Sequence, residues 1–276
     1  MKKITLLFSA TICFSAMGIA QTNGSLKLTK GQKYVVENKL STTTSTQVQG
    51  QSMDSKADIA SVYNIEVKDK TDNSFNLTNT ITNLKMSMSM MGQDINFDSD
   101  KKEDMDGEMG SSLKSYINQP KDVQIDNSGN VITKTTADSS ESDLSKQLGI
   151  DAAGYGTQMA FLALPKNLKA GTTWSDSADN EGITKSTTYI VKDITGGIAT
   201  VSFSGTIATD KKFEQQGMEV STKTTGKFSG EEKVDTKTGV VQTNTSTSEA
   251  SGTVNAMGQE FPTTTKITST TSVKSL

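Results

Sequence analysis

The sequence predicts a mainly β protein made of two pseudo-repeated antiparallel β units that form a curved sheet or open barrel. Apolar and polar residues alternate over long Ser/Thr-rich stretches, which is typical of half-buried strands. A glycine-centred motif, suited to the positive φ of a tight hairpin, recurs between these stretches at residues 49–53, 91–95, 216–220 and 257–261. The same order of motifs then repeats along the chain.

The prediction divides the chain into four segments: a signal peptide (1–20), a first β unit (21–138), a helical connector (139–165) and a second β unit (166–276). Both units begin with one spacing of a leucine, a glycine and an aromatic residue: Leu28, Gly31 and Tyr34, then Leu168, Gly171 and Trp174. Three later positions correspond in the same order: Val67, Gly92 and Asp126 match Val191, Gly217 and Asp235. We therefore expect the two units to share one strand order.

Residues 1–20 have the features of a secretory signal peptide. Lys2 and Lys3 form a positive n-region, and an apolar stretch follows. Gly18 and Ala20 supply the small residues of a cleavage site. The apolar stretch is shorter than the ~20 residues that span a bilayer. We expect an exported protein, periplasmic or extracellular, with no transmembrane segment after the signal is removed.

The strand predicted over residues 75–90 changes the parity of its apolar residues near the middle. The odd-numbered set is Phe75, Leu77 and Ile81, and the even-numbered set is Leu84, Met86, Met88 and Met90. Because odd and even residues of a strand point to opposite faces, an unbroken strand would expose one set. That would forgo about 1.5–3 kcal/mol for each large side chain. We predict a β-bulge at Thr82–Asn83, which restores one buried face.

The connector differs from the strands in composition. Residues 140–143 match a capping box, and apolar residues follow at helical spacing. We predict a short helix, a glycine-rich break at residues 154–156, and a second helical turn that ends before Pro165. The helical segment would lie against the concave face of the sheet.

The composition excludes several classes of function. The chain contains no histidine or arginine, which excludes Ser-His-Asp triads and His-ligated zinc. Loss of Lys2 and Lys3 with the signal peptide lowers the net charge from −3 to about −5, which disfavours a nucleic-acid partner. Cys13 is the single cysteine and lies in the signal peptide, so the mature chain forms no internal disulfide. We expect no cofactor.

The candidate ligand-binding residues are apolar: Met86, Met88, Met90, Met159 and Phe161. Methionine provides an adaptable surface for apolar ligands, and its thioether is also a soft ligand for Cu(I). A core strand that uses methionine as filler is the third interpretation of the methionine run. We assign no metal site and no catalytic residue.

Acidic residues give no stronger candidate. The run over residues 98–108 lacks the spacing of an EF-hand, and Lys101 and Lys102 would oppose a bound cation. We expect a solvated loop there. Pairs of carboxylates can hydrolyse glycosides without histidine, but no pattern marks two acids as facing each other.

The leading Leu-x-x-Gly-x-x-Tyr motif, the stretch from Leu164 to Trp174 and the Met-Gly-Gln hairpin tips resemble an uncharacterised family of secreted β-rich proteins from Bacteroidota-type bacteria. The resemblance implies a β-rich exported protein with no assigned activity, and no site residue follows from it. By analogy alone, the architecture is also similar to the curved half-barrels of periplasmic lipoprotein carriers.

Three hypotheses of function follow. The first is a non-catalytic exported envelope protein that binds an apolar or lipid-like ligand, or an envelope protein as partner. The second is a purely structural or surface-interaction β protein without a ligand cavity. The third is a His-independent hydrolase. An apolar-lined cavity would favour the first, a packed interior the second, and two converging, desolvated carboxylates the third.

Overall fold

The computed structural model describes residues 19–20, 24–90, 92–134, 155–180, 182–215, 218–256 and 258–276. These residues form one sheet of thirteen strands: β1 (Ile19–Ala20), β2 (Lys33–Val48), β3 (Gln51–Lys70), β4 (Ser74–Met90), β5 (Gln93–Asp98), β6 (Lys121–Asp126), β7 (Val131–Lys134), β8 (Thr173–Asn180), β9 (Ile183–Thr195), β10 (Ile198–Gln215), β11 (Met218–Asp235), β12 (Val241–Ala256) and β13 (Gln259–Ser275). Three short helices are described: α1 (Lys102–Asp106), α2 (Glu108–Leu113) and α4 (Tyr155–Ala160). None of the helices in these residues has the length and hydrophobicity needed to cross a bilayer.

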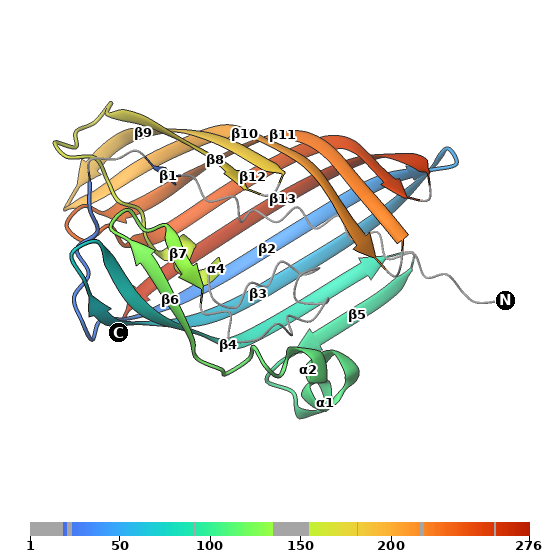
Figure 1. Cartoon of the computed structure of the whole chain (residues 1–276), viewed down its shortest axis with the longest axis horizontal. Coiled ribbons are helices and arrows are strands. Elements are labelled where there is room, and N and C mark those ends of the chain that lie inside the picture. Colours follow the sequence, from blue (N-terminus) through green and yellow to red (C-terminus); the bar gives the residue numbers. More distant parts are fainter. Residues whose placement is uncertain are drawn as a thin grey trace.

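The sheet is antiparallel, open and strongly curved (Figure 1). Its strand order is β1-β8-β9-β10-β11-β12-β13-β2-β3-β4-β6-β7, and β5 pairs with the outer part of β4. The C-terminal strand β13 lies between β12 and β2, so it joins the second unit to the first. The predicted fold class, mainly β with a curved antiparallel sheet, is confirmed.

The glycine-centred motifs are hairpin connections. They join β2 to β3, β4 to β5, β10 to β11, and β12 to β13. Gly50, Gly92 and Gly258 have φ values of 80°, 76° and 74°, which favour glycine. Because the strands alternate in direction, all four connections lie at the same end of the sheet (Figure 1).

The starts of the two units have the same hydrogen-bonded turn. In the first unit, the Gly31 amide donates to the Val67 carbonyl at 2.8 Å. In the second, the Gly171 amide donates to the Val191 carbonyl at 2.9 Å. The strands that follow are then adjacent in the same order, β2-β3-β4 and β8-β9-β10. The internal repeat is therefore present in the backbone, while the four segment boundaries stay predictions.

The structure describes two residues of the predicted signal peptide. β1 belongs to the predicted signal peptide, and in the structure it pairs with β8 through Ile19–Ser177 and Ala20–Asp176. Residues 1–18 and 135–154 lie outside the described residues, and with them the end of the first unit and the predicted capping box and first helix of the connector.

The units differ where the first contains an insertion. β11 is one continuous strand beside β10, whereas β4 pairs with β5 at one end and β6 at the other, with α1 and α2 between them. Residues 98–108 are solvated as expected, but they contain helical turns rather than a loop. The Asp104 carboxylate accepts the Asp98 amide at 2.8 Å, and Met105, Met109 and Leu113 pack on the core, which stabilises helical turns there.

The bulge predicted in β4 is confirmed. Val62 pairs with Asn83 and Tyr63 pairs with Ile81, so Thr82 has no partner across the strand pair. The extra residue reverses the parity of the strand. As a result, residues of both apolar sets are buried on the same side: Phe75, Leu77, Ile81, Leu84 and Met86.

The main core fills the concave side of the first unit. α4 and the segment after it pack into this core, where Phe161 meets the Tyr34 ring edge-on at 5.5 Å between centroids. The predicted glycine-rich break is wrong at Gly156, which lies inside α4. Its backbone is so close to the Tyr63 ring that an added Cβ would lie 2.5 Å from the ring's Cγ.

The predicted second helical turn ends earlier than expected. α4 stops at Ala160, and Phe161 forms an isolated antiparallel bridge with Val240. The Leu162 amide then donates to the Gly239 carbonyl at 2.8 Å. Pairing with the second unit provides these backbone partners, so residues 161–164 are extended rather than helical.

Candidate functional site

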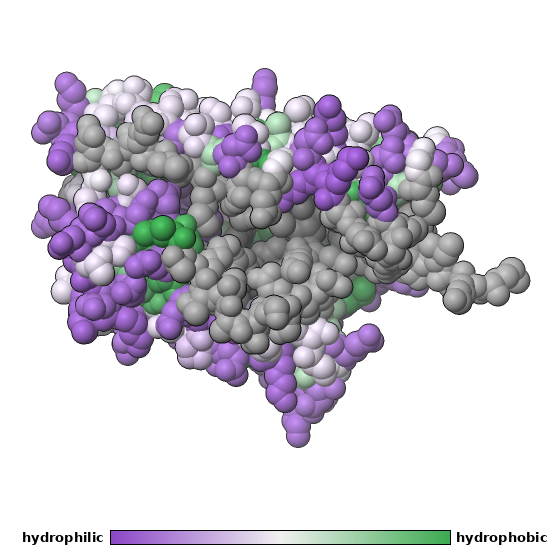
Figure 2. Space-filling model, in the orientation of Figure 1, coloured by the Kyte–Doolittle hydropathy of each residue, from purple (hydrophilic) through white to green (hydrophobic). Residues whose placement is uncertain are grey.

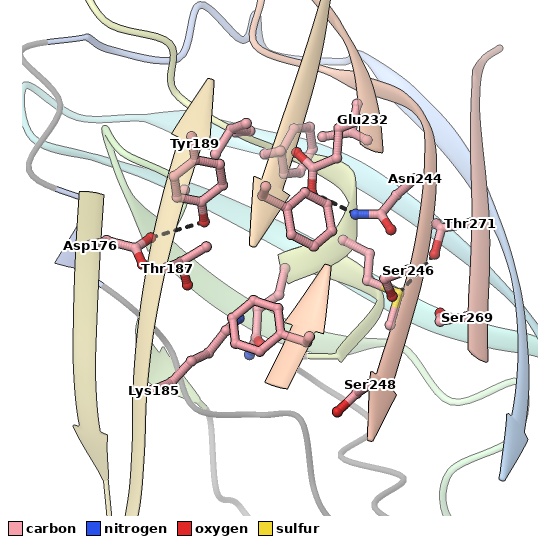
Figure 3. Close-up of a pocket in the computed structure, with 18 of the residues that line it drawn as sticks. Asp176, Lys185, Thr187, Tyr189, Glu232, Asn244, Ser246, Ser248, Ser269 and Thr271 are labelled. Atoms are coloured by element: carbon pink, nitrogen blue, oxygen red, sulfur yellow. Dashed lines mark hydrogen bonds between the residues drawn. The ribbon is translucent and has the colours of Figure 1, made fainter. Parts of the chain in front are cut away.

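A cavity of about 220 Å³ lies on the concave side of the second unit, between the sheet and the segment that contains α4 (Figure 3). Its apolar wall includes Met159, Phe161, Leu162, Phe203, Phe228 and Ile267. We call six of its polar residues the polar wall: Asp176, Lys185, Thr187, Tyr189, Glu232 and Asn244. The cavity therefore has an amphipathic lining.

Strand alternation places the polar wall on the inner face. Its three β9 members are two residues apart along the strand, so their side chains point to the same side. Asp176 of β8 pairs with Thr187 of β9, and Glu232 of β11 pairs with Asn244 of β12. Four strands of the sheet, β8, β9, β11 and β12, thus present polar groups to one space, and β10 lies between β9 and β11.

Two hydrogen bonds hold the carboxylates of the polar wall (Figure 3). The Tyr189 hydroxyl donates to Asp176 Oδ2 at 3.0 Å, and the Asn244 amide donates to Glu232 Oε1. The Trp174 ring stacks on Tyr189 at 4.9 Å between centroids and 7° between planes. This stacking fixes the phenol that orients Asp176.

Each carboxylate keeps a second oxygen without a partner. Asp176 Oδ1 and Glu232 Oε2 are shielded from solvent and make no hydrogen bond. Glu232 is partly exposed as a whole residue, but its Oε2 is not. An unsatisfied buried polar atom costs about 1–3 kcal/mol, and such atoms in a native structure need an explanation.

Burial changes the proton affinities of the polar wall. It raises the pKa of Glu232 to about 7, although the Asn244 hydrogen bond and the Lys185 charge act in the opposite direction. Burial also lowers the pKa of Lys185, against the attraction of Asp176 and Glu232. The pKa of Tyr189 is raised well above its usual value, first by burial and then by the two carboxylates.

Metal binding finds little support in this arrangement. Within the described ranges, no group of three or more His, Cys, Asp or Glu residues is placed to hold a metal ion. The polar wall contains two carboxylates, and Lys185 adds a positive charge that would oppose a cation there.

The structure separates the five ligand-binding residues predicted from the sequence. Met159 and Phe161 line the cavity, and the Met159 sulfur accepts a hydrogen bond from Thr271 at 3.2 Å. Met86 is buried in the core of the first unit, and Met88 is half-buried further along β4. The side chain of Met90 lies outside the described residues. Met86 and Met88 therefore do not contribute to this cavity.

Sequence reasoning missed the charged residues of the cavity. Lys185 has the same parity on β9 as Tyr189 and Val191, and Glu232 has the same parity on β11 as Val234. A charge at an inward position of an alternating strand was the available signal. A single charge of this kind is also compatible with a strand end in solvent, so the signal alone did not identify a site.

Among the described residues, exposed apolar side chains on the surface are scattered. Hydrophilic residues dominate much of the face shown in Figure 2, with apolar residues in small patches. The large hydrophobic residues that are exposed among the described residues are few: Ile95, Ile132, Ile190, Ile194 and Leu276. Scattered exposed residues of this kind are normal on soluble surfaces.

Comparison with known proteins identifies the family. Residues 72–152 and 133–241 each match the Family of unknown function (DUF6263), and together these matches cover more than half of the chain. The chain belongs to the DUF6263 family. The two overlapping matches each include part of one β unit. No curated protein matches the sequence.

Among solved structures, the fold is similar to that of lipovitellin, in a structure described as "Lipid-protein interactions in lipovitellin". The TM-score is 0.50 at 13% sequence identity, over 90% of this chain and 25% of the lipovitellin chain. The DUF6263 chain thus spans a quarter of lipovitellin, and the likeness concerns the fold alone. An outer membrane channel from Pseudomonas putida F1 gives a TM-score of 0.27 at 10% identity, over 91% of this chain and 98% of the channel. That score is too low to inform the fold.

Proposed function

We propose that this DUF6263 protein is an exported, non-catalytic binding protein that holds a small amphiphile between its sheet and α4. The observation that carries the proposal is the cavity, which has apolar residues on one wall and buried, incompletely hydrogen-bonded polar groups on the other. Binding sites for small molecules commonly combine apolar walls with a few convergent polar groups. A purely structural β protein has no need of unsatisfied buried carboxylates.

Two further observations support the proposal. The fold is similar to that of lipovitellin, whose structure is described in terms of lipid–protein interactions. The first 20 residues have the pattern of a secretory signal, which accords with a carrier or receptor in the periplasm or outside the cell.

The size of the cavity limits the ligand. Its volume of about 220 Å³ lies below the ~300–1,000 Å³ of drug-sized ligand sites. A chain of roughly eight carbons is a suitable probe. Burying six methylenes would contribute about 5 kcal/mol before the cost of association is subtracted. The apolar wall alone therefore supports weak binding, and the polar wall must supply further affinity.

Titration with 1-octanol tests the apolar part of the proposal. Trp174 is the single tryptophan and stacks on the cavity residue Tyr189, so its fluorescence reports occupancy. We expect saturable binding to the wild type. Ser248 is buried and lines the cavity, so Ser248→Leu should fill part of it and weaken binding about tenfold. Thr247→Leu, on the exposed side of the same strand, is the matched control and should bind as the wild type does.

Native mass spectrometry of protein purified from its source cells tests the natural ligand. We expect a small amphiphile to accompany the wild type and to be lost from Ser248→Leu. Absence of both a co-purified molecule and saturable octanol binding would contradict the proposal. Export is tested separately by the mature N-terminus, which should follow Ala20; a mature chain that begins at Met1 would refute it.

A hydrolase is the second candidate, because Asp176 and Glu232 both lie in the cavity and burial raises the pKa of Glu232 to about 7. A protonated acid opposite an ionised carboxylate is the arrangement used in glycoside hydrolysis. Release of nitrophenol from a panel of nitrophenyl glycosides tests it. Turnover that disappears in Glu232→Gln would replace the binding proposal with an enzymatic one.

A further inference from the structure

The charges of the polar wall are unbalanced. Asp176 and Glu232 each carry a carboxyl group, and Lys185 is the cation of the polar wall. The Lys185 ammonium lies over the Phe228 ring, 4.9 Å from the ring centroid. Lys185 forms no ion pair within 4.0 Å with either carboxylate, and its effect on them is through space. With both acids ionised, the polar wall therefore has an excess of one negative charge.

The atoms left without partners are mainly acceptors. Asp176 Oδ1 and Glu232 Oε2 are shielded and unpaired, while the other oxygen of each group is already hydrogen-bonded. Ionised carboxylates can only accept hydrogen bonds. Gln158 also has an unpaired polar atom, its side-chain nitrogen, but its amide contains both a donor and an acceptor and can adapt to either kind of ligand group.

Aromatic rings of both walls lie close together. Tyr189 lies between Trp174 and Phe203, at centroid distances of 4.9 Å and 6.2 Å. Phe203 in turn lies 6.3 Å from Phe228. The faces of aromatic rings attract cations, as the Lys185 ammonium over the Phe228 ring illustrates. A ligand cation is therefore compatible with the aromatic residues around the cavity.

We propose that the ligand carries a primary ammonium head group, which lies against the polar wall and donates a hydrogen bond to the Asp176 or the Glu232 carboxylate. The proposal rests on the binding function above and names its ligand class. A primary ammonium has three donors and no acceptor, and it supplies the missing positive charge. A carboxylate head would meet two like charges, a hydroxyl has one donor, and a quaternary ammonium has no N–H.

A series of ligands with one tail tests the head group. The probes are octylamine, octyltrimethylammonium, 1-octanol and octanoate, each titrated at about pH 8, where an alkylamine is protonated and Glu232 is ionised. We expect the affinity for octylamine to be at least about tenfold higher than for each of the other three, because hydrogen bonds to charged groups are stronger than those between neutral groups.

Variants assign the preference to the two carboxylates. In Asp176→Asn/Glu232→Gln, the preference for octylamine over 1-octanol should disappear. Glu231→Gln is the matched control, because Glu231 is exposed on the opposite side of β11. It should keep the wild-type preference. Circular dichroism and the thermal transition establish that each variant is folded.

The outcomes separate this inference from the binding function. If octanoate binds best, or the four probes bind equally, the ammonium proposal is overturned and the binding function stands. If none of the four probes binds, both are overturned. Because the probe series is measured on the wild type, the inference is decided even if a variant fails to fold.

Discussion

The two β units use the same strands for different purposes. In the first, the concave face is filled by a continuous apolar core with α4 packed into it. In the second, the concave face has smaller apolar clusters and a cavity with charged residues. The apolar core of the first unit stabilises the sheet, while the second unit keeps polar groups without hydrogen bonds. Such groups lower the folding stability locally, and the protein can tolerate them at a functional site when another region stabilises the fold.

Strand register identifies single positions that correspond between the two β units. Leu77 pairs with Val123 in the first unit, and the corresponding pair in the second is Val201 and Glu232. Val123 is buried in an apolar core, and Glu232 is the acid whose pKa is raised to about 7. A buried valine in one copy therefore corresponds to a buried carboxyl group in the other.

The same relation holds two strands away. Val36 pairs with Tyr63 in the first unit, and Asp176 pairs with Thr187 in the second. The polar wall thus occupies positions that are apolar or aromatic in the first unit. At these positions the second unit has more polar residues, and Thr187 is also smaller than Tyr63.

The largest expected effect on stability comes from placing in the first unit the carboxyl group that the second unit has at the corresponding position. Val123→Glu places a carboxyl group in an apolar core without an arranged partner, so the free energy of unfolding should fall by about 4 kcal/mol or more. Urea unfolding followed by Trp174 fluorescence measures it. Val123→Gln, which has the same shape without the charge, should cost less. A loss below about 1 kcal/mol for Val123→Glu would mean that the first unit tolerates charge as the second does.

The next effect is the pH dependence of stability due to Glu232. Its pKa is raised from 4.5 to about 7 in the folded protein, so the folded state binds the proton more tightly than the unfolded state. The stabilising contribution is full below pH 4.5 and is lost as the pH rises through about 7. The change is on the order of 3 kcal/mol.

This pH dependence is measured as a difference between wild type and Glu232→Gln. The groups that act on Glu232 are Asp176 from β8, Lys185 and Tyr189 from β9, and Asn244 from β12. Subtracting the free energy of unfolding of Glu232→Gln from that of the wild type at each pH leaves the contribution of Glu232 ionisation. Parallel stability curves for the two proteins between about pH 4.5 and 7 would contradict the raised pKa.

A smaller effect of opposite sign is expected when the second unit is made apolar. Glu232→Val/Asn244→Val removes both hydrogen-bonded partners together and eliminates the unpaired Oε2. We expect the free energy of unfolding to rise by about 1–3 kcal/mol and any preference for octylamine to decrease. The exposed control Glu231→Val should change stability by less than about 0.5 kcal/mol. A strong loss of stability in the double variant would show that Glu232 is a structural residue.

The smallest effect concerns a feature that the units share. Asp126 accepts the Ser128 and Asn130 amides, and Asp235 accepts the Lys237 and Thr238 amides, at 2.8–2.9 Å. Asp126→Ala and Asp235→Ala should each cost about 1 kcal/mol, because both remove the same turn-capping contacts. Thermal unfolding measures both. Markedly different losses would mean that the two turns are not equivalent.

Much of the fold could be predicted from local patterns in the sequence. Alternation, glycine-centred tips and the repeated Leu-Gly-aromatic motif predicted the strands, their connections and the two units. The bulge at Thr82 followed from parity, because two apolar sets cannot share one face of a regular strand. These features depend on residues close together in the chain, where backbone sterics and side-chain periodicity act directly.

The helices were predicted less well, because their partners are distant in the sequence. Gly156 looked like a break, but its place in α4 depends on the Tyr63 ring. The extended conformation of residues 161–164 depends on pairing with Val240 of the second unit. Composition alone contained neither contact.

The amino-acid sequence alone predicts a repetitive antiparallel β fold and excludes catalytic or metal sites that need histidine, because strand periodicity and missing residue types are visible at single positions. The position of the candidate site, in contrast, follows from the folded structure. Asp176, Lys185 and Glu232 are far apart in the chain, and strand register with sheet curvature brings them around one cavity, where burial raises the pKa of Glu232. The physical reason is that desolvation and charge interactions depend on distances in space, which a local pattern does not specify.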